Sequence, residues 1–323
     1  MARRSKPAKN LYAQLEELNL LLKNFENTLS TADLREKVLA LVPSVDALRD
    51  LGSGLVDSAG SLSARERIIE YFKKYPFTII DGRELAIVSG IGEWARRVRE
   101  LRREYGWRIY TGMTIQEIVN DSELGELQVS AMLQFDLSKL SPTDYVLTSE
   151  MQDREAAFRW KFLSDLRKSE GGMKSKILKY FRSNLGNVVT GEELKYLARN
   201  NSTWARRVRE LRTEDGWQIL TKMQGRPDLQ VGEYLMEDDR QAQPHDRNIP
   251  DSVRVAVLER DKFACVHCGW TRDQLSPDDP RKFLELHHVE EHVDGGSNEA
   301  DNLVALCNVH HDDVHAGRLI LNQ

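Results

Sequence analysis

The segment CVHC at residues 265–268 is followed by LELHHV at 284–289, DNLVALC at 301–307 and HHDDVH at 310–315. The last sixty residues hold all three cysteines of the 323-residue chain and seven of its eight histidines. Thiolates and imidazoles are the side chains that bind transition metals most readily, so this concentration is far from random. The sequence therefore predicts two metal sites in one small C-terminal module.

Two pairs of residues at the same spacing predict a structural zinc site. Cys265 and Cys268 are separated by two residues, and Cys307 and His310 repeat that spacing. Three thiolates and one imidazole suit a tetrahedral zinc ion and leave no open position. Three cysteines cannot form a closed set of disulfides, which favours zinc in a reducing cytoplasm. The alternative is a core with three unligated cysteines. A helix over residues 252–260 is expected before the first pair.

The residues between and after these ligands resemble the HNH nuclease family, whose members are also called ββα-metal nucleases. The resemblance covers roughly residues 250–320 and rests on the paired histidines, the central Asn-Leu step and the final histidines. It implies a module that cuts phosphodiester bonds, with His288 as the general base, Asn302 as the middle residue and His311 as the last. In the colicin-type branch a further histidine four residues on also binds the catalytic metal, and His315 fits that position.

The expected secondary structure supports this assignment independently. Neighbouring residues on a strand face opposite sides, so His287 can bind a metal while His288 is available as a base. His311 and His315 are four residues apart on an expected helix and point to one side. With His287 they make a three-imidazole site with open positions for the scissile phosphate. Glu285 either orients a ligand from behind or is an exposed strand residue.

Two positions depart from the common pattern of the family. Many relatives carry Cys where this chain has His310, and many carry Asp where His287 stands. Three imidazoles favour later transition metals over magnesium in affinity, although cellular supply can still select magnesium. The catalytic metal is therefore expected to be Mg²⁺, or else Mn²⁺ or Ni²⁺. The side-chain amide of Asn302 is expected to fix either the imidazole of His288 or the loop that follows it.

The middle of the chain contains an internal duplication. Residues 94–102 and residues 204–212 both read WARRVRELR. Each copy is expected to run as helix, turn, helix, helix and two strands, an order that resembles a winged helix. A two-copy repeat indicates two similar small domains, since a solenoid needs three or more units. In the first copy, helices are expected over residues 64–75, 81–89 and 93–105, with Gly106 as the stop and a strand from Trp107.

The third helix of each copy is expected to contact DNA. In the first copy Trp94, Val98 and Leu101 face inward, and arginines line the outward face at steps of three and four. Such a helix would lie in the major groove, where arginine contacts guanine edges or phosphates. The alternative is an ordinary solvated helix face. The arginines assigned to DNA binding are Arg96, Arg97, Arg99 and Arg103 in the first copy and Arg206, Arg207 and Arg209 in the second.

Apolar residues near the N-terminus predict a helix with a short hydrophobic seam on one face. They alternate in steps of four and three, as in a short heptad seam. The seam either packs on its own domain or joins two copies of the chain. A second helix is expected over residues 31–42, capped by Ser30 or Thr31 and stopped by Pro43. The seam residues are Leu11, Leu15, Leu18, Leu22, Phe25 and Leu29.

Composition and segment boundaries predict a multidomain protein that is mainly α with α+β parts. The net charge of −5 argues against a uniformly basic nucleic-acid coat, so DNA must be bound by local basic faces. No membrane span or signal peptide is recognisable, which favours the cytoplasm, and the basic residues 1–9 are expected to be disordered. The expected parts are 1–60, a helical dimerisation segment; 61–150, the first repeat; 151–236, a connecting helix and the second repeat; 237–250, a linker; and 251–323, the nuclease module.

Together these parts predict a sequence-specific DNA endonuclease of the type II restriction kind. The repeats would find the site on double-stranded DNA and the HNH module would cut it. One such module cuts one strand, so a double-strand break would need a homodimer on a near-palindromic site. Two alternatives stay open. The repeats could sense a methylated base, or the chain could be a non-catalytic, zinc-containing DNA-binding regulator.

Overall fold

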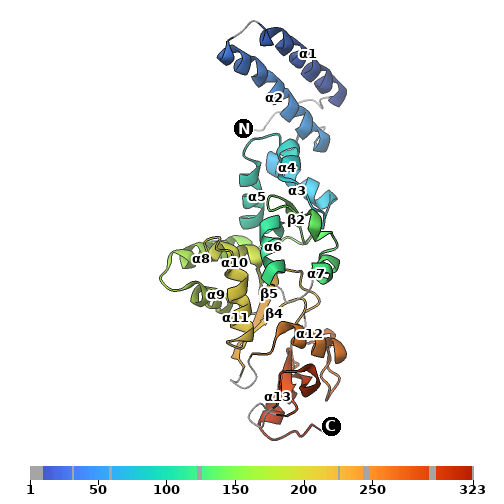
Figure 1. Ribbon diagram of the computed structural model, residues 1–323, viewed down its shortest axis with the longest axis vertical. Helices are drawn as coiled ribbons and strands as arrows, with labels where there is room; N and C mark the ends of the chain where they lie inside the picture. The colour runs from blue at the N-terminus through green and yellow to red at the C-terminus, as the bar shows by residue number, and fades with distance from the viewer. Residues whose placement is uncertain are drawn as a thin grey trace. The chain divides into compact units, whose positions relative to one another are not determined.

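A computed structural model of the protein describes residues 10–30, 33–57, 60–121, 126–224, 226–242, 248–290 and 296–321. The chain divides into two compact units, each built from two stretches of sequence (Figure 1). The first comprises Met1–Met113 and Ser138–Trp160, and the second comprises Thr114–Leu137 and Lys161–Gln323. Helices dominate and the sheets are small, which agrees with a multidomain fold of α and α+β parts. The basic N-terminal tail, Thr31 and the middle of the expected linker lie outside the described residues.

The first unit begins with an antiparallel pair of helices, α1 (Leu11–Leu29) and α2 (Leu34–Val56) (Figure 1). The side chain of Asn10 caps α1, and that of Asp33 caps α2. The predicted stop at Pro43 is wrong, because α2 runs through the proline for another thirteen residues, to Val56. A proline inside a helix costs one backbone hydrogen bond. Helix α2 packs against α1 and α4, and this packing offsets that cost.

The predicted N-terminal seam is divided between two faces of α1. Leu18 is buried, and Leu11 and Phe25 are partly buried. Leu15, Leu22 and Leu29, by contrast, are exposed at seven-residue intervals. Packing within the same domain therefore accounts for only part of the seam.

The rest of the first unit contains the first copy of the repeat. Its core gathers apolar residues from three helices around Ile68, Phe72 and Leu85. Capping boxes begin two of these helices, at Ser63 and at Asp81. The elements are α3 (Ala64–Lys74), α4 (Gly82–Ser89), α5 (Trp94–Arg103), and strands β1 (Ile109–Thr111) and β2 (Tyr145–Leu147), which pair antiparallel.

Gly106 ends the third helix of this copy, as the sequence predicts. Its φ of +68° lies in the left-handed region, which favours glycine. A Cβ added there would lie 1.7 Å from the carbonyl oxygen of Asp153, so no side chain fits. Between β1 and β2 the chain forms elements that were not expected, namely α6 (Gly112–Asp121), α7 (Glu126–Leu133) and the short helix η1 (Leu137–Lys139).

The second unit contains the second copy. Its three strands form one antiparallel sheet in the order β3-β5-β4. The linker predicted to begin at residue 237 is wrong for its first residues, because β5 continues to Gln241 and pairs there with Trp217 of β4. The elements are α8 (Ala156–Lys168), which begins at the end of the first unit, α9 (Met173–Arg182), β3 (Val188–Thr190), α10 (Gly191–Leu197), α11 (Trp204–Thr213), β4 (Trp217–Leu220) and β5 (Glu233–Gln241).

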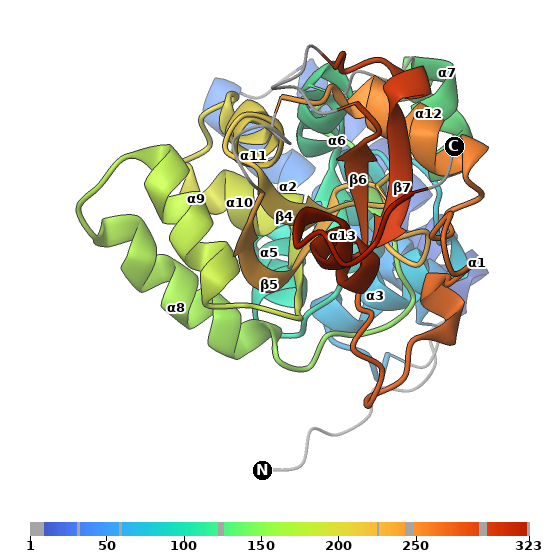
Figure 2. The same ribbon diagram turned by 90° about the horizontal axis from the view of Figure 1, so that it is seen from below.

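The C-terminal module packs two short strands against two helices. Strands β6 and β7 lie side by side, with α13 next to them (Figure 2). Leu286 of β6 and Leu303 and Ala305 of β7 share a core with Val257 and Leu258 of the helix before them. The elements are α12 (Asp251–Arg260), η3 (Arg272–Gln274), β6 (Leu284–His288), η5 (Ala300–Asn302), β7 (Leu303–Cys307) and α13 (Asn308–His315).

No helix in the described ranges is long and apolar enough to cross a membrane.

Candidate metal centres and active site

One cluster joins the loop after α12 to the start of α13. Cys265 and Cys268 lie in a tight turn, Cys307 ends β7, and His310 lies in the first turn of α13. The ligand atoms of these four residues all lie within 4.8 Å of one another. Nδ1 of His310 is 3.2 Å from Sγ of Cys307 and 3.6 Å from Sγ of Cys265. The structure thus brings together all four residues predicted to bind one metal.

Electrostatics in this cluster favour a thiolate. A hydrogen bond from Cys307 holds the pKa of the Cys265 thiol well below its usual range, although burial acts in the opposite direction. The same contact and burial raise the pKa of Cys307. Both sulfurs are buried against Trp270 and Leu306. Three sulfurs and one imidazole nitrogen, with two of the sulfurs in an apolar cluster, are donors that suit a tetrahedral transition-metal ion.

A second cluster joins β6 to α13. His287 from β6 and His311 and His315 from α13 offer ligand atoms within 4.8 Å of one another. The two helix residues are four apart, and their Nε2 atoms are 3.3 Å apart. His287 and His311 are buried, whereas His315 is exposed. Three imidazoles with one open side can hold a divalent ion and leave room for a ligand from solvent.

Glu285 lies behind the second cluster. It is two residues before His287 on β6 and therefore faces the same side of the strand. Its side chain is 5% exposed, and Oε2 lies 3.6 Å from Nδ1 of His311. Of the two expectations for Glu285, the exposed strand residue is wrong. The carboxylate lies where it can orient a metal-binding imidazole.

His288 points to the other side of β6 and is held by a residue that sequence analysis missed. Its Nε2 lies 2.7 Å from Oδ1 of Asn298. Nδ2 of Asn298 donates to the carbonyl of Asn248, which fixes the orientation of the amide. The ring of His288 is 1% exposed, so it is more enclosed than sequence analysis expected of a base.

Asn302 fixes the loop after His288, one of its two expected roles. Its Oδ1 accepts from the backbone N–H of Glu290 at 2.8 Å, and its Nδ2 donates to the carbonyls of Glu290 and Ser297. Gly296 lies against this side chain, since an added Cβ would come within 2.8 Å of Nδ2. Asn302 therefore clamps the two ends of the loop that follows the general-base candidate.

The duplicated helices carry the same ion-pair geometry. On α5, Glu100 pairs with Arg96 and Arg97 at 3.2 and 2.7 Å, and on α11 the matching Glu210 pairs with its two arginines at 2.9 and 2.6 Å. The hydrogen bond from Arg97 lowers the pKa of Glu100. On each helix, one glutamate thus partly neutralises the charge of two neighbouring arginines. The matching pair on α11 is Arg206 and Arg207.

Two more of the predicted DNA-binding arginines, Arg103 and Arg209, contact other side chains of the protein. Arg99 is exposed as expected, but the guanidinium of Arg103 lies 4.9 Å from the ring of Trp160 in the same unit. The expected outward position of Arg103 is therefore wrong, because a cation–π contact holds it. Arg209 in the second copy donates to Asp121 at 3.2 Å.

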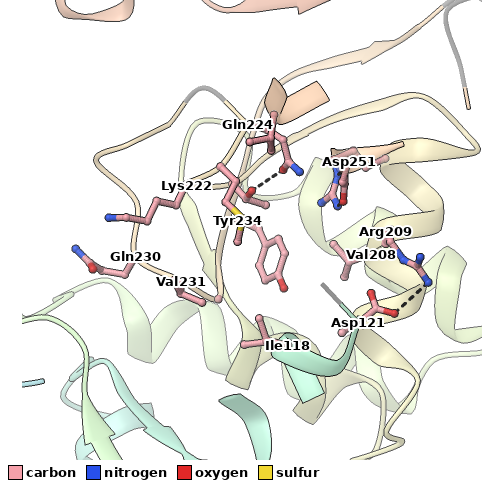
Figure 3. A pocket seen from close by; sticks show the side chains of 16 residues that line it. Ile118, Asp121, Val208, Arg209, Lys222, Gln224, Gln230, Val231, Tyr234 and Asp251 are labelled. Atoms are coloured by element: carbon pink, nitrogen blue, oxygen red, sulfur yellow. Dashed lines mark hydrogen bonds and ion pairs between the residues drawn. The ribbon is translucent and has the colours of Figure 1, made fainter. Parts of the chain in front are cut away.

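Arg209 lines a pocket in the second unit, beside α11 (Figure 3). The ring of Tyr234 points into this pocket, and burial raises the pKa of its hydroxyl. On the same wall Arg212 pairs with Asp251, the first residue of α12, through two hydrogen bonds, one of 3.0 Å. The Arg212–Asp251 pair therefore holds the second repeat to the C-terminal module.

Comparisons with known proteins find matches for the duplicated repeats and for the C-terminal module. Residues 265–317 match the HNH endonuclease family, and residues 65–148 and 174–237 match the KpnI N-terminal domain. A type IV methyl-directed restriction enzyme of Escherichia coli K12, EcoKMcrA, is 35% identical over 63 residues. That match spans 20% of this chain and 22% of the relative's length. No solved structure matches the chain.

These matches confirm the predicted HNH endonuclease module. The HNH match contains every residue of both metal-binding clusters, and it spans His288 and Asn302 as well. The KpnI N-terminal match covers both copies of the WARRVRELR helix. The likeness to a restriction enzyme supports the same class of nuclease.

Proposed function

We propose that this chain, which carries an HNH endonuclease domain, is a restriction endonuclease that hydrolyses phosphodiester bonds of double-stranded DNA at specific sites. The observation that carries this proposal is the convergence of His287, His311 and His315 on one point. His288 and Asn302 lie on the elements beside them. This set of residues lies within the segment that matches the HNH family.

The two clusters differ in what they would hold. The site of Cys265, Cys268, Cys307 and His310 has four donors and suits a zinc ion that stabilises the fold. The three-histidine site suits the catalytic ion, Mg²⁺, Mn²⁺ or Ni²⁺. A divalent ion bound there would polarise the scissile phosphate and stabilise the charge that develops on the leaving 3′ oxygen.

We infer from the hydrogen bond to Asn298 which nitrogen of His288 would act as the base. Because Oδ1 of the amide can only accept, Nε2 of His288 donates to it, and in the neutral ring the lone pair would then lie on Nδ1. We assign to Nδ1 the removal of a proton from the attacking water. Since the ring is enclosed, this role requires that bound DNA opens a path for the water to His288.

The duplicated helices α5 and α11 would contact the DNA, in domains whose element order resembles a winged helix. Their exposed and half-buried arginines have the reach and charge for phosphates and guanine edges. The pairing with Glu100 and Glu210 keeps the free protein from carrying a strong basic patch. The arginines proposed for this role are Arg96, Arg97, Arg99, Arg206 and Arg207.

The N-terminal helices would join two copies of the chain. Besides the leucines on α1, helix α2 exposes a second apolar stripe at steps of three, four and seven residues, which is the spacing of a heptad seam. Its side chains are between 37% and 79% exposed. A homodimer would supply the two HNH sites that a double-strand break needs. The stripe consists of Leu34, Val38, Leu41, Val45, Leu48 and Leu55.

A second candidate function is cleavage that requires a modified base. The likeness to a methyl-directed restriction enzyme favours it, although that match covers about a fifth of either protein. A third candidate, a regulator without nuclease activity, would not need the complete histidine set. Three cysteines that form no disulfide suit a cytoplasmic location for any of these functions.

The test is digestion of methylated and unmethylated forms of one phage genome with Mg²⁺, Mn²⁺ or Ni²⁺, followed by sequencing of the fragment ends. Ends that share one sequence on unmethylated DNA support a site-specific restriction enzyme. Fragments from methylated DNA alone support the modification-dependent alternative. Binding without cleavage under every condition, and no difference from His288→Ala, would support the regulator.

A further inference from the structure

The catalytic histidine cluster is contacted by side chains from outside the HNH match. Nε2 of Gln218, on β4 of the second repeat, donates to Oε1 of Glu285 at 2.7 Å. Sixty-seven residues separate the two in sequence. This contact occupies one oxygen of a nearly buried carboxylate, and the other oxygen, Oε2, is the one that lies toward His311. Gln218 therefore fixes which way the carboxylate of Glu285 faces.

Arg240, on β5 of the same repeat, contacts the cluster from a second direction. Its guanidinium lies 3.5 Å from Oε2 of Glu285. It also donates two hydrogen bonds to Asp312, which follows His311 on α13, one of them 3.0 Å long. A planar guanidinium can hold two carboxylates in a fixed relation. Arg240 therefore ties Glu285 on β6 to the helix that carries His311 and His315.

The position of the Glu285 carboxylate influences which nitrogen of His311 can bind a metal ion. A carboxylate beside Nδ1 of His311 favours the tautomer with its proton on Nδ1, which leaves the lone pair on Nε2. Nε2 is the atom that faces His315 and the ligand cluster. A correctly oriented Glu285 thus prepares His311 to bind the ion.

We propose that Gln218 and Arg240 are positioning residues of the nuclease centre, and that strands β4 and β5 of the second repeat complete the metal site by orienting Glu285 against His311. This inference rests on the proposed function for the identity of the site. It implies that the HNH module binds its catalytic ion fully only while the second repeat is docked on it. DNA contact at the repeat would thereby be coupled to metal binding at the cutting site.

Other contacts hold the two parts together without Gln218 and Arg240. Arg212 pairs with Asp251, Arg272 pairs with Glu237 at 2.5 Å, and the N–H of Asn248 donates to the carbonyl of Thr213. Removing the positioning contacts should therefore leave the repeat docked. Their effect on the metal site can then be measured apart from undocking.

The test uses the full-length, zinc-loaded chain with Gln218→Leu and Arg240→Met, and Asp239→Asn as the matched control. Asp239 also lies on β5, but it pairs with Arg182. Titration calorimetry with Mn²⁺ and with Ni²⁺ measures binding to the histidine cluster, and thermal unfolding checks the fold. We expect Kd to rise about tenfold or more in both variants, within the range typical of such outer contacts, and to stay unchanged in the control.

Two further readouts separate positioning from a merely structural role. In a Glu285→Gln background, Gln218→Leu should cause little additional loss of metal affinity, because both act through one carboxylate. Arg240→Lys, which keeps the charge, should recover part of the affinity. Equal Kd values for the unaltered chain and both variants, or no second ion bound by the unaltered chain, would overturn the inference. Absence of DNA cleavage while these Kd differences hold would count against the proposed function alone.

Discussion

Oδ1 of Asn298 lies 2.7 Å from Nε2 of His288, and the same amide donates to the carbonyl of Asn248. The hydrogen bond to Asn248 determines which atom of the Asn298 amide faces His288. Because Nδ2 donates to that carbonyl, the amide oxygen is presented to the imidazole. Nε2 of His288 is therefore the donor in this contact. Strand β6 thus places His287 of the three-histidine cluster on one side and, on the other side, the imidazole of His288 with its Nε2 held by Asn298.

His288→Ala should abolish cleavage while DNA binding persists. Loss of a general base costs about 10²–10⁴-fold in rate. Asn298→Ala keeps the ring but removes the atom that fixes its tautomer, so a smaller loss is expected. Single-turnover cleavage rates and fluorescence anisotropy with a labelled duplex measure the two properties separately. Cleavage by His288→Ala at the unaltered rate would remove this residue from the mechanism.

Asn302→Ala should destabilise the C-terminal module and slow cleavage together. The side chain makes three hydrogen bonds to the backbone on both sides of the loop after β6. Because these hydrogen bonds are exposed, the loss of each costs about 0.5–1.5 kcal/mol. Asn302→Asp keeps the acceptor for the N–H of Glu290 but turns a carboxylate oxygen toward two carbonyl oxygens, so it should destabilise the module at least as much as Asn302→Ala. Thermal unfolding, followed by cleavage below the transition, measures both effects. A full loss of activity at unchanged stability would contradict a loop-clamping role.

Cys307→Ser should release the structural metal and unfold the C-terminal module. Because such a site exists only in the folded module, the free energy of metal binding contributes directly to the free energy of folding. Metal analysis after dialysis should show about one zinc fewer per chain than in the unaltered protein. His267→Ala is the matched control. His267 lies between two ligands and its ring is 4.5 Å from that of His310, but it is not in the four-residue cluster. The control should keep its zinc.

Glu100→Gln should raise the affinity for DNA and change the response to acid. It releases Arg96 and Arg97 from their ion pairs with this carboxylate. Each additional phosphate that these arginines neutralise steepens the salt dependence of binding by roughly 0.9 in log–log slope. The hydrogen bond from Arg97 lowers the pKa of Glu100 below its ordinary 4.5. Stability from this pair is therefore present above that value and is lost as the pH falls through the lowered pKa.

The variant should accordingly be less stable than the unaltered chain at neutral pH, with the difference shrinking below about pH 4.5. Glu104→Gln removes the same charge one turn later, at the exposed end of α5, and serves as the control. Salt titrations of DNA binding check the predicted rise in affinity, and acid titrations of unfolding check the predicted pH dependence of stability. Equal affinities for both variants would mean that net charge alone, and not release of the paired arginines, governs binding.

Local spacing was sufficient to predict which cysteines and histidines lie together, but not which residues contact them from the second repeat. The C-x2-C, C-x2-H and i,i+4 patterns place donors together through one turn or one helix face, so short-range geometry decides them. Gln218 and Arg240 lie 67 and 72 residues from their partners Glu285 and Asp312. No pattern in the sequence brings β4 and β5 to that strand. Only the tertiary packing of the second repeat on the module does so.

Two errors in the sequence analysis have the same physical origin. Pro43 is a strong local signal for the end of a helix, yet contacts of α2 with α1 and α4 carry the helix past it. The spacing of Arg103 along its helix predicts an outward side chain, but its guanidinium packs against the ring of Trp160 instead. In both places a contact distant in sequence outweighs the local preference.

The exposed stripe on α2 predicts how the chain associates. Val45→Glu combined with Leu48→Glu places two charges in the middle of the stripe, where a seam between two helices would have to bury them. We expect the double variant to sediment as a monomer while the unaltered chain sediments as a dimer. On supercoiled plasmid, the monomer should accumulate nicked circles where the dimer yields linear DNA.

The matched control for the stripe is Met151→Glu, an exposed apolar residue elsewhere in the first unit. It changes charge and exposed apolar surface in a similar way without touching the seam, so it should leave both the sedimentation and the products unchanged. Linear products from the double variant at every enzyme concentration would show that the stripe does not hold the cutting pair together. Because neither substitution lies near the histidine cluster in sequence or within the same unit, a shift from linear to nicked product reports association and not damage to the nuclease centre.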